Sequence, residues 1–187
     1  MLAKPPSSPA LPRDRPPPMR FSLIDRIVEL KRGEKIVAVK SLSLAEEYLA
    51  DHFPRFPVLP GVFMIEAMSQ AATWLIREQE DFANSVVILK EAKNIKYSGF
   101  VFPGDTLTVE ATVVRHDDRE TTLKVKGSVG DNLCVGGRLV LERYNLADED
   151  PSQSPRDDYT RGDAREQFAL IGGPAAAEAD LQETVGS

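Results

Sequence analysis

Residues 62–76 constrain the fold of this chain more than any other segment. The run VFMIEAMSQAATWLI consists largely of good helix formers and contains no helix breaker, and apolar residues occupy nearly every face of the helix that it would form. A helix that is apolar all round has to be covered by other elements, so the run predicts a buried central helix. The remaining segments must supply that cover.

The segments around the central run have the patterns of strands. Residues 35–42 alternate between apolar and polar with period two, and residues 21–30, which lead to a turn at Gly33, are typical of a short helix or an edge strand. Ser43 and Glu46 have the spacing of a capping box and predict a short helix over 44–50. Further strand-like segments follow at 86–89, 95–97, 107–114, 121–129 and 134–144, with turn residues between the longer ones. The pattern predicts an α+β fold in which an antiparallel sheet wraps around one long helix.

Composition divides the chain into three parts. Residues 1–18 hold seven of the fourteen prolines, and residues 147–187 carry three basic and ten acidic side chains, a net charge of −7. We therefore predict a disordered Pro-rich leader over 1–18, one folded domain over 19–146 and a disordered acidic tail over 147–187. Met19, which follows three prolines, is a candidate natural start.

Charge and hydropathy disfavour several classes of function. Residues 20–146 carry seventeen basic and eighteen acidic side chains without a run of Lys or Arg, which argues against nucleic acid as a partner. No apolar stretch has the length of a signal peptide or a membrane span, so we expect a cytoplasmic protein without a membrane partner. Cys134 is the only cysteine; it cannot form an intrachain disulfide, we expect it in the core, and no metal site is predicted.

Glu66 is the only ionisable residue in the central run. Residues on its helical face are apolar or uncharged, which predicts a semi-polar groove instead of a solvated surface. A buried carboxyl either finds hydrogen-bond partners or stays protonated, and a protonated carboxyl is a general acid at neutral pH. Gln70, one helical turn further on, is placed to hold it. The alternative is a glutamate that faces solvent.

His52 lies in a segment that is stiffened by Pro54, Pro57 and Pro60. A rigid backbone is what a general base requires, although a surface loop histidine is the alternative.

Gly61 begins the central helix, where the free N–H groups of the first turn can bind an oxygen that gains negative charge. The alternative is that Gly61 only forms the turn.

The segment HFPRFPVLPGVFMIEAMSQ at 52–70 closely resembles the signature of β-hydroxyacyl-acyl-carrier-protein dehydratases of the FabZ/FabA type, with its HFP, PG and EAxxQ elements. The resemblance covers about residues 20–144, including LIDR at 23–26 and FPGD at 102–105. It implies a hotdog fold and a homodimer, or a trimer of such dimers, with sites between subunits. His52 of one chain would remove the α-proton and Glu66 of the other would protonate the leaving hydroxyl, which yields a trans-2-enoyl thioester.

The resemblance also implies a partner and further site residues. The partner is acyl-carrier protein, which brings the acyl chain on its own phosphopantetheine arm, so no cofactor or metal is implied. Gly61, Val62, Gln70 and Arg55 are the expected substrate-binding residues. Asp51 and Arg55 replace family glycines, and Lys93 lies in a departing segment; these departures support one alternative, a non-catalytic acyl-binding subunit. A hotdog acyl thioesterase is the other alternative.

Overall fold

The computed structural model describes residues 21–52 and 55–172, and this part of the chain forms one six-stranded antiparallel sheet with strand order β1-β2-β4-β5-β6-β3. The strands are β1 (Arg26–Lys31), β2 (Lys35–Ser41), β3 (Val86–Tyr97), β4 (Thr106–His116), β5 (Glu120–Val129) and β6 (Asn132–Tyr144). The last three form the predicted meander, β2 pairs with β4, and β3 pairs with β6. The edges of the sheet are therefore β1 and β3.

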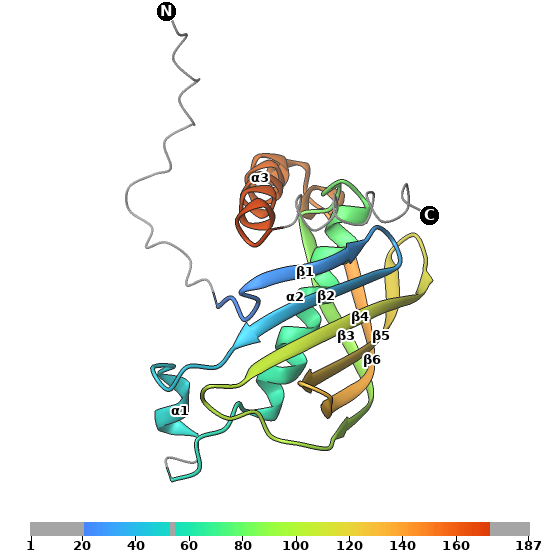
Figure 1. Ribbon diagram of the computed structural model, residues 1–187. Helices are drawn as coiled ribbons and strands as arrows, with labels where there is room; N and C mark the ends of the chain where they lie inside the picture. The colour runs from blue at the N-terminus through green and yellow to red at the C-terminus, as the bar shows by residue number, and fades with distance from the viewer. Residues whose placement is uncertain (1–20, 53–54, 173–187) are drawn as a thin grey trace, which may run out of the picture.

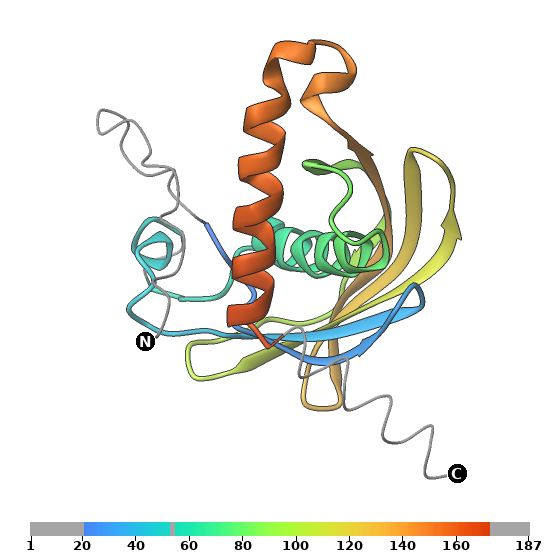
Figure 2. The same ribbon diagram turned by 90° about the horizontal axis from the view of Figure 1, so that it is seen from above.

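The predicted central helix is α2 (Gly61–Gln79), and the sheet curves around it (Figures 1 and 2). Met68, Ala71 and Leu75 on this helix are fully buried, and they belong to one core with buried residues of β1, β2, β4, β5 and β6, against which partly buried apolar residues of β3 pack. This arrangement confirms the α+β fold. Cover is not complete, however, because Val62 in the first turn is 65% exposed. Across the described ranges, no helix is both long and apolar enough to cross a membrane.

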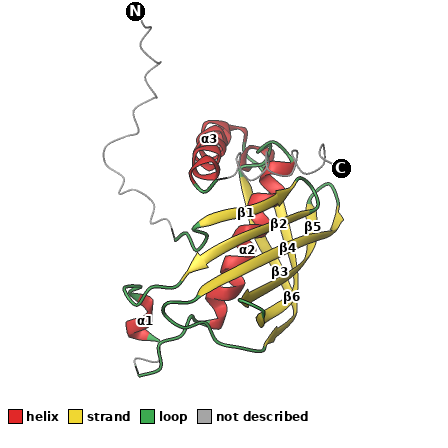
Figure 3. Ribbon diagram, viewed as in Figure 1, coloured by secondary structure: helices red, strands yellow, loops and turns green. Residues whose placement is uncertain are grey.

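Two local predictions are wrong in detail (Figure 3). The short helix α1 (Tyr48–Asp51) begins later than the capping-box pattern predicted, because Ser43 Oγ accepts a hydrogen bond from Ala45 N at 3.1 Å and Glu46 pairs with Lys40 at 2.6 Å instead. In addition, the segments 86–89 and 95–97 are not separate strands but the ends of the single strand β3.

A β-bulge keeps β3 continuous. The pairing of β3 with β6 shifts between Lys93 and Lys96, and Asn94 has a positive φ of 53°. Gly137 lies opposite this bulge on β6, where an added Cβ would be 2.6 Å from Ile95 Cδ1 and 3.0 Å from the Lys93 carbonyl oxygen. The bulge therefore requires a glycine at this position.

The prediction of a disordered tail is wrong for residues 147–170. Two short 3₁₀ helices (Leu146–Asp148 and Pro151–Gln153) lead into α3 (Ser154–Leu170), which crosses α2 (Figure 2). Residues 173–187 of the predicted tail, and the predicted leader over 1–18, lie outside the described residues.

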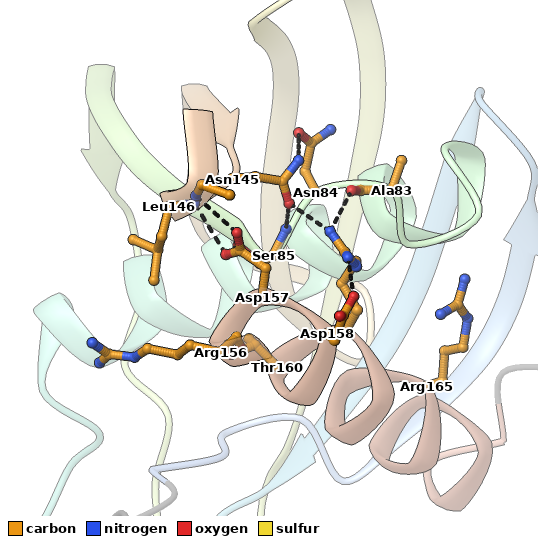
Figure 4. A network of polar contacts seen from close by, with 12 residues as sticks. Ala83, Asn84, Ser85, Asn145, Leu146, Arg156, Asp157, Asp158, Thr160 and Arg165 are labelled. Atoms are coloured by element: carbon orange, nitrogen blue, oxygen red, sulfur yellow. Dashed lines mark hydrogen bonds and ion pairs between the residues drawn. The ribbon is translucent and has the colours of Figure 1, made fainter. Parts of the chain in front are cut away.

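Buried polar contacts attach α3 to the sheet domain (Figure 4). Asp157 is only 1% exposed, and its carboxylate accepts hydrogen bonds from the Ser85 hydroxyl and from the N–H groups of Leu146 at 3.0 Å and Ala147 at 2.9 Å. Phe168 packs against Trp74, with ring centroids 6.0 Å apart. The acidic composition of this segment predicted disorder. The composition did not show that Ser85 and Trp74, which are distant in sequence, hold Asp157 and Phe168 in place.

Candidate active site

Glu66 lies partly buried on α2, and its carboxylate is held by the side chain one turn further along the helix. Gln70 Nε2 donates to Glu66 Oε1 at 2.9 Å, which confirms the contact that the spacing predicted. The same nitrogen donates to the Phe21 carbonyl at 2.9 Å, and Gln70 Oε1 accepts from the Leu23 N–H at 2.8 Å. Gln70 therefore fixes both the Glu66 carboxylate and the segment that leads into β1.

Glu66 lines a pocket of about 430 Å³. One wall is a stripe along α2 formed by Glu66, Ser69, Gln70, Thr73, Trp74 and Arg77. Val87, Ile88 and Leu89 of β3 form the apolar side, while Thr160, Asp163, Ala164 and Gln167 of α3 also contribute to the wall. A concave, partly apolar pocket with a few polar groups is typical of small-molecule sites.

Arg77 is the cationic residue of the pocket wall. Its Nη2 donates to the Ser85 carbonyl at 2.9 Å. Burial lowers the pKa of this guanidinium, whereas the nearby negative charge of Asp163 raises it.

Within the described part of the chain, no three His, Cys, Asp or Glu side chains are grouped as a metal site.

His52 follows α1 directly and is partly buried. An aromatic contact positions α1, since the Tyr48 ring packs edge-on against Phe63 of α2 with centroids 4.7 Å apart. Burial and the charge of Glu46 raise the pKa of the Tyr48 phenol, which keeps it neutral. His52 does not belong to the lining of the pocket that holds Glu66. One chain therefore does not place the two predicted catalytic residues in the same pocket.

The first turn of α2 presents backbone donors. The Pro60 carbonyl accepts from the N–H groups of Phe63 at 2.9 Å and Met64 at 3.2 Å, so the N–H groups of Gly61 and Val62 precede the helical hydrogen-bond ladder. Gly61 is packed closely, because an added Cβ would lie 2.9 Å from Tyr97 Cε1. Burial raises the pKa of the Tyr97 phenol. Neither Gly61 nor Val62 lines the Glu66 pocket.

An exposed surface surrounds this first turn. The rings of Phe56, Phe100 and Phe102 form an aromatic cluster with centroids 5.5 to 6.2 Å apart, and all three are exposed. Arg55 precedes Phe56 and is exposed, as are Lys93 and Lys96 on β3. Of the six predicted site residues, the pocket therefore brings together Glu66 and Gln70; the others lie outside its lining.

The pocket also contains residues that the sequence did not predict. Thr160, Asp163, Ala164 and Gln167 of α3 were missed because their segment was predicted to be disordered. A weak signal existed, since Ala164, Phe168 and Ile171 have the spacing of one helical face and Pro155 suits the first turn of a helix. Arg77 was missed because the apolar run ends before it.

The chain is similar in sequence to known proteins. Residues 15–143 match the model of the FabA-like domain. The chain is 36% identical over 119 residues to the 3-hydroxyacyl-[acyl-carrier-protein] dehydratase FabZ of Ruminiclostridium cellulolyticum, covering 64% of this chain and 84% of the relative. It is 38% identical over 116 residues to the enzyme of the same name from Lactiplantibacillus plantarum, covering 61% of this chain and 79% of the relative.

The fold is similar to that of a chain in a solved dehydratase complex. A chain of the dehydratase heterocomplex ApeI:P from Xenorhabdus doucetiae superposes with a TM-score of 0.57 and 19% identity, covering 67% of this chain and 85% of that chain. The match to the family model ends before α3 begins.

Proposed function

Because the chain belongs to the FabA-like family, we propose that it removes water from 3-hydroxyacyl thioesters carried by acyl-carrier protein, with His52 and Glu66 as its acid/base pair. Dehydration of 3-hydroxyacyl thioesters in fatty-acid biosynthesis is the reaction class of its curated relatives, and the chain is a dehydratase of this class. The observation that carries the assignment of roles is the Glu66 carboxyl, which lines a pocket and is held there by Gln70.

The two residues divide the reaction between them. His52 takes the proton from the α-carbon, and the electron pair of that C–H bond forms the double bond to the β-carbon. Glu66 gives its proton to the β-hydroxyl, so the C–O bond breaks and the oxygen leaves as water. The N–H groups of Gly61 and Val62 are aimed outward from the helix start and stabilise the charge that develops on the thioester oxygen. Solvent then restores both protonation states.

We further propose that the complete site is shared by two chains of a homodimer. Two observations support this arrangement. His52 lies outside the lining of its own chain's Glu66 pocket, and in this proposal a second copy supplies the histidine. In addition, β3 is a twelve-residue edge strand whose middle, Glu91 to Asn94, is exposed, and long unpaired edges in native proteins are usually covered. Pairing of β3 with a second β3 would cover it, and a trimer of such dimers remains compatible with this contact.

The partner in this proposal is the acidic acyl-carrier protein. Exposed Arg55, Lys93 and Lys96 supply cations, although Lys93 already pairs with Glu91 at 2.9 Å. The carrier would deliver the thioester on its phosphopantetheine arm to the first turn of α2. A cytoplasmic location, predicted from the sequence, belongs to the same proposal.

The reaction type can be tested with 3-hydroxybutyryl and crotonyl thioesters. A dehydratase interconverts the two, which is measured by the ultraviolet absorbance of the conjugated enoyl thioester, without release of free thiol. Release of thiol at the same rate as substrate loss would identify a thioesterase. No reaction with either substrate, together with retained binding of the acyl chain, would identify a non-catalytic subunit.

The acid/base roles can be tested by two variants and a mixing experiment. Glu66→Gln keeps size and hydrogen bonding but cannot deliver a proton, so kcat should fall about 10²- to 10⁴-fold, and His52→Ala should do the same. Glu78→Gln on the same helix, outside the pocket, is the matched control.

Mixing the two inactive homodimers under subunit exchange should restore activity, because a mixed dimer contains one site with both native residues. Near-wild-type turnover by Glu66→Gln would refute the roles, and folded variants that never complement would refute the shared site.

A further inference from the structure

Helix α3 adds a wall to the Glu66 pocket that the FabA-like domain itself does not provide. The family match ends at residue 143, whereas Thr160, Ala164 and Gln167 line the same pocket as Glu66. The C-terminal segment of this chain therefore contributes directly to the cavity in which the acyl group would react.

The pocket extends along α2 away from Glu66. Its α2 wall runs from Glu66 through Trp74 to Arg77. Helix α3 meets α2 at Trp74, where Phe168 packs on the indole ring. Trp74 lies eight residues beyond Glu66, which is about 12 Å along the axis at the α-helical rise of 1.5 Å per residue. An acyl chain that has its β-carbon at Glu66 and follows the apolar side formed by β3 thus runs toward α3.

This wall is firmly attached at both of its ends. At its start, Asp157 is buried among three hydrogen-bond donors, and Arg161 Nη1 donates to Asn145 Oδ1 at 2.9 Å. At its end, the Ile171 carbonyl accepts from the Ile27 N–H of β1 at 2.8 Å. Movement of α3 away from the pocket would break these contacts, so the wall is a fixed part of the site.

The α3 side of the pocket is also polar. Asp163 and Gln167 hydrogen-bond to each other at 3.0 Å, and Arg77 lies on the neighbouring part of the α2 wall. An alkyl chain that reaches these groups would remove water from them without replacing its hydrogen bonds, which is unfavourable. The α3 wall limits the length of the pocket, and the polar groups at this end make binding of a long acyl chain less favourable.

We propose that α3 is the far wall of the acyl-chain pocket and limits the length of the 3-hydroxyacyl chain that this dehydratase accepts. The inference rests on the proposed function. It assigns to the C-terminal helix a role in specificity, with Ala164 and Gln167 as the residues that set the limit.

The test measures kcat/KM for 3-hydroxybutyryl, 3-hydroxyhexanoyl and 3-hydroxydecanoyl thioesters with full-length variants. Ala164→Trp fills the pocket and should lower the ratio of long-chain to short-chain kcat/KM by at least about tenfold, since a single methylene in an apolar pocket is worth about 10- to 200-fold. Gln167→Ala opens the pocket and should raise the same ratio. Ala169→Trp places the same new side chain on the exposed face of α3 and should leave the ratio unchanged.

Two pocket variants are used so that the result does not depend on the folding of Ala164→Trp alone. If Ala164→Trp does not fold, Gln167→Ala still has to shift preference toward longer chains. Folded variants at both positions with the wild-type ratio would overturn the role of α3, while wild-type activity on 3-hydroxybutyryl thioester would leave the proposed function intact. A wild-type protein that dehydrates none of the three substrates would overturn the proposed function, and this inference with it.

Discussion

Gln70 joins three parts of the candidate site through its side-chain amide. Its amide oxygen and nitrogen are both used, by the Leu23 N–H on one side and by Phe21 and Glu66 on the other. The spacing from Glu66 to Gln70 predicted one of these three contacts, because residues four apart share a helical face. The contacts to residues 21 and 23 were not predictable, since they join positions almost fifty residues apart.

Gln70→Leu should damage both activity and stability. The Glu66 carboxyl would lose its support, and a misplacement of about 1 Å in an active site can lower kcat by about 100-fold. The buried Leu23 N–H would also lose its acceptor, which costs about 1–3 kcal/mol in the free energy of unfolding. Steady-state kinetics and urea unfolding measure the two effects.

Gln79→Leu is the matched control on the same helix. Gln79 Oε1 is buried and has no hydrogen-bond partner among the described residues, so replacing it with an apolar side chain should change the free energy of unfolding little. An equal loss of stability in both variants would show that the contacts of Gln70 have no special role.

At the scale of elements, β3 and α3 are the parts near the pocket that the sequence pattern did not predict correctly. Two strand-like segments at 86–89 and 95–97 were separated by charged and polar residues, which interrupt the alternation that marks a strand. The structure joins them because the bulge at Asn94 absorbs the irregular register opposite Gly137. A bulge depends on the partner strand, and its position cannot be deduced from one strand alone.

Gly137→Ala should disturb this bulge. The new methyl group would meet Ile95 and two backbone oxygens at 3.2 Å or less, and such overpacking costs about 1–3 kcal/mol in the free energy of unfolding. Gly136→Ala is the neighbouring control, because its nearest neighbour would be the Val125 carbonyl oxygen at an ordinary 3.6 Å. If β3 forms the dimer contact, size-exclusion chromatography should show weaker dimerisation for Gly137→Ala only. Equal behaviour of the two variants would argue against the bulge as a constraint.

The attachment of α3 should depend on pH through Asp157. Burial alone would raise the pKa of this carboxyl, but the hydrogen bonds from Ser85, Ala147 and Leu146 and the charge of Arg161 lower it below its ordinary value of 3.8. A carboxyl with a lowered pKa in the folded state stabilises that state fully above its ordinary pKa, and this contribution is lost as the pH falls through the folded-state pKa. At neutral pH, α3 should therefore be held firmly.

Asp157→Asn should release this helix without unfolding the sheet. The amide cannot accept hydrogen bonds at both of its terminal atoms, so amide hydrogen exchange over residues 154–170 should become faster at pH 7, while exchange in β4 and β5 stays unchanged. Asp158→Asn, at the exposed neighbouring position, is the control. Unchanged protection of α3 in Asp157→Asn would show that its other contacts, such as the packing of Phe168 and the hydrogen bonds of Arg161 and Ile171, hold it without this carboxylate.

At the scale of the whole molecule, the two functional regions lie at different ends of α2. The pocket extends from Glu66 toward the C-terminal half of the helix, whereas Gly61 and Val62 form its first turn. The exposed aromatic cluster is linked to the residues just before this turn, because the Leu59 N–H donates to the Val101 carbonyl between Phe100 and Phe102. Sequence motifs indicated the family, the central helix and both candidate catalytic residues, because these are local patterns. The pocket was beyond prediction because its walls come from α2, β3 and α3 together.

Docking of an acidic carrier at the first turn of α2 should depend on ionic strength. Arg55 is exposed beside this surface, so Arg55→Ala should raise KM for acyl-carrier-protein substrates and weaken the dependence of KM on salt. Arg156→Ala, an exposed arginine on α3, is the control. A KM that responds neither to salt nor to Arg55→Ala would exclude this docking surface.

The hydrogen bond between Ile171 and Ile27 also has a consequence for the order in which the protein is completed during synthesis. The ribosome makes β1 early and residue 171 late. The Ile27 N–H of β1 can therefore form this hydrogen bond only after almost all of the described chain has been translated. A nascent chain that ends after β6 already contains every strand and the segment that matches the FabA-like domain. Its pocket, however, still lacks α3. The dehydratase domain can therefore assemble before the wall that would restrict its substrate, and α3, which follows it in the described chain, is the helix that would set its selectivity.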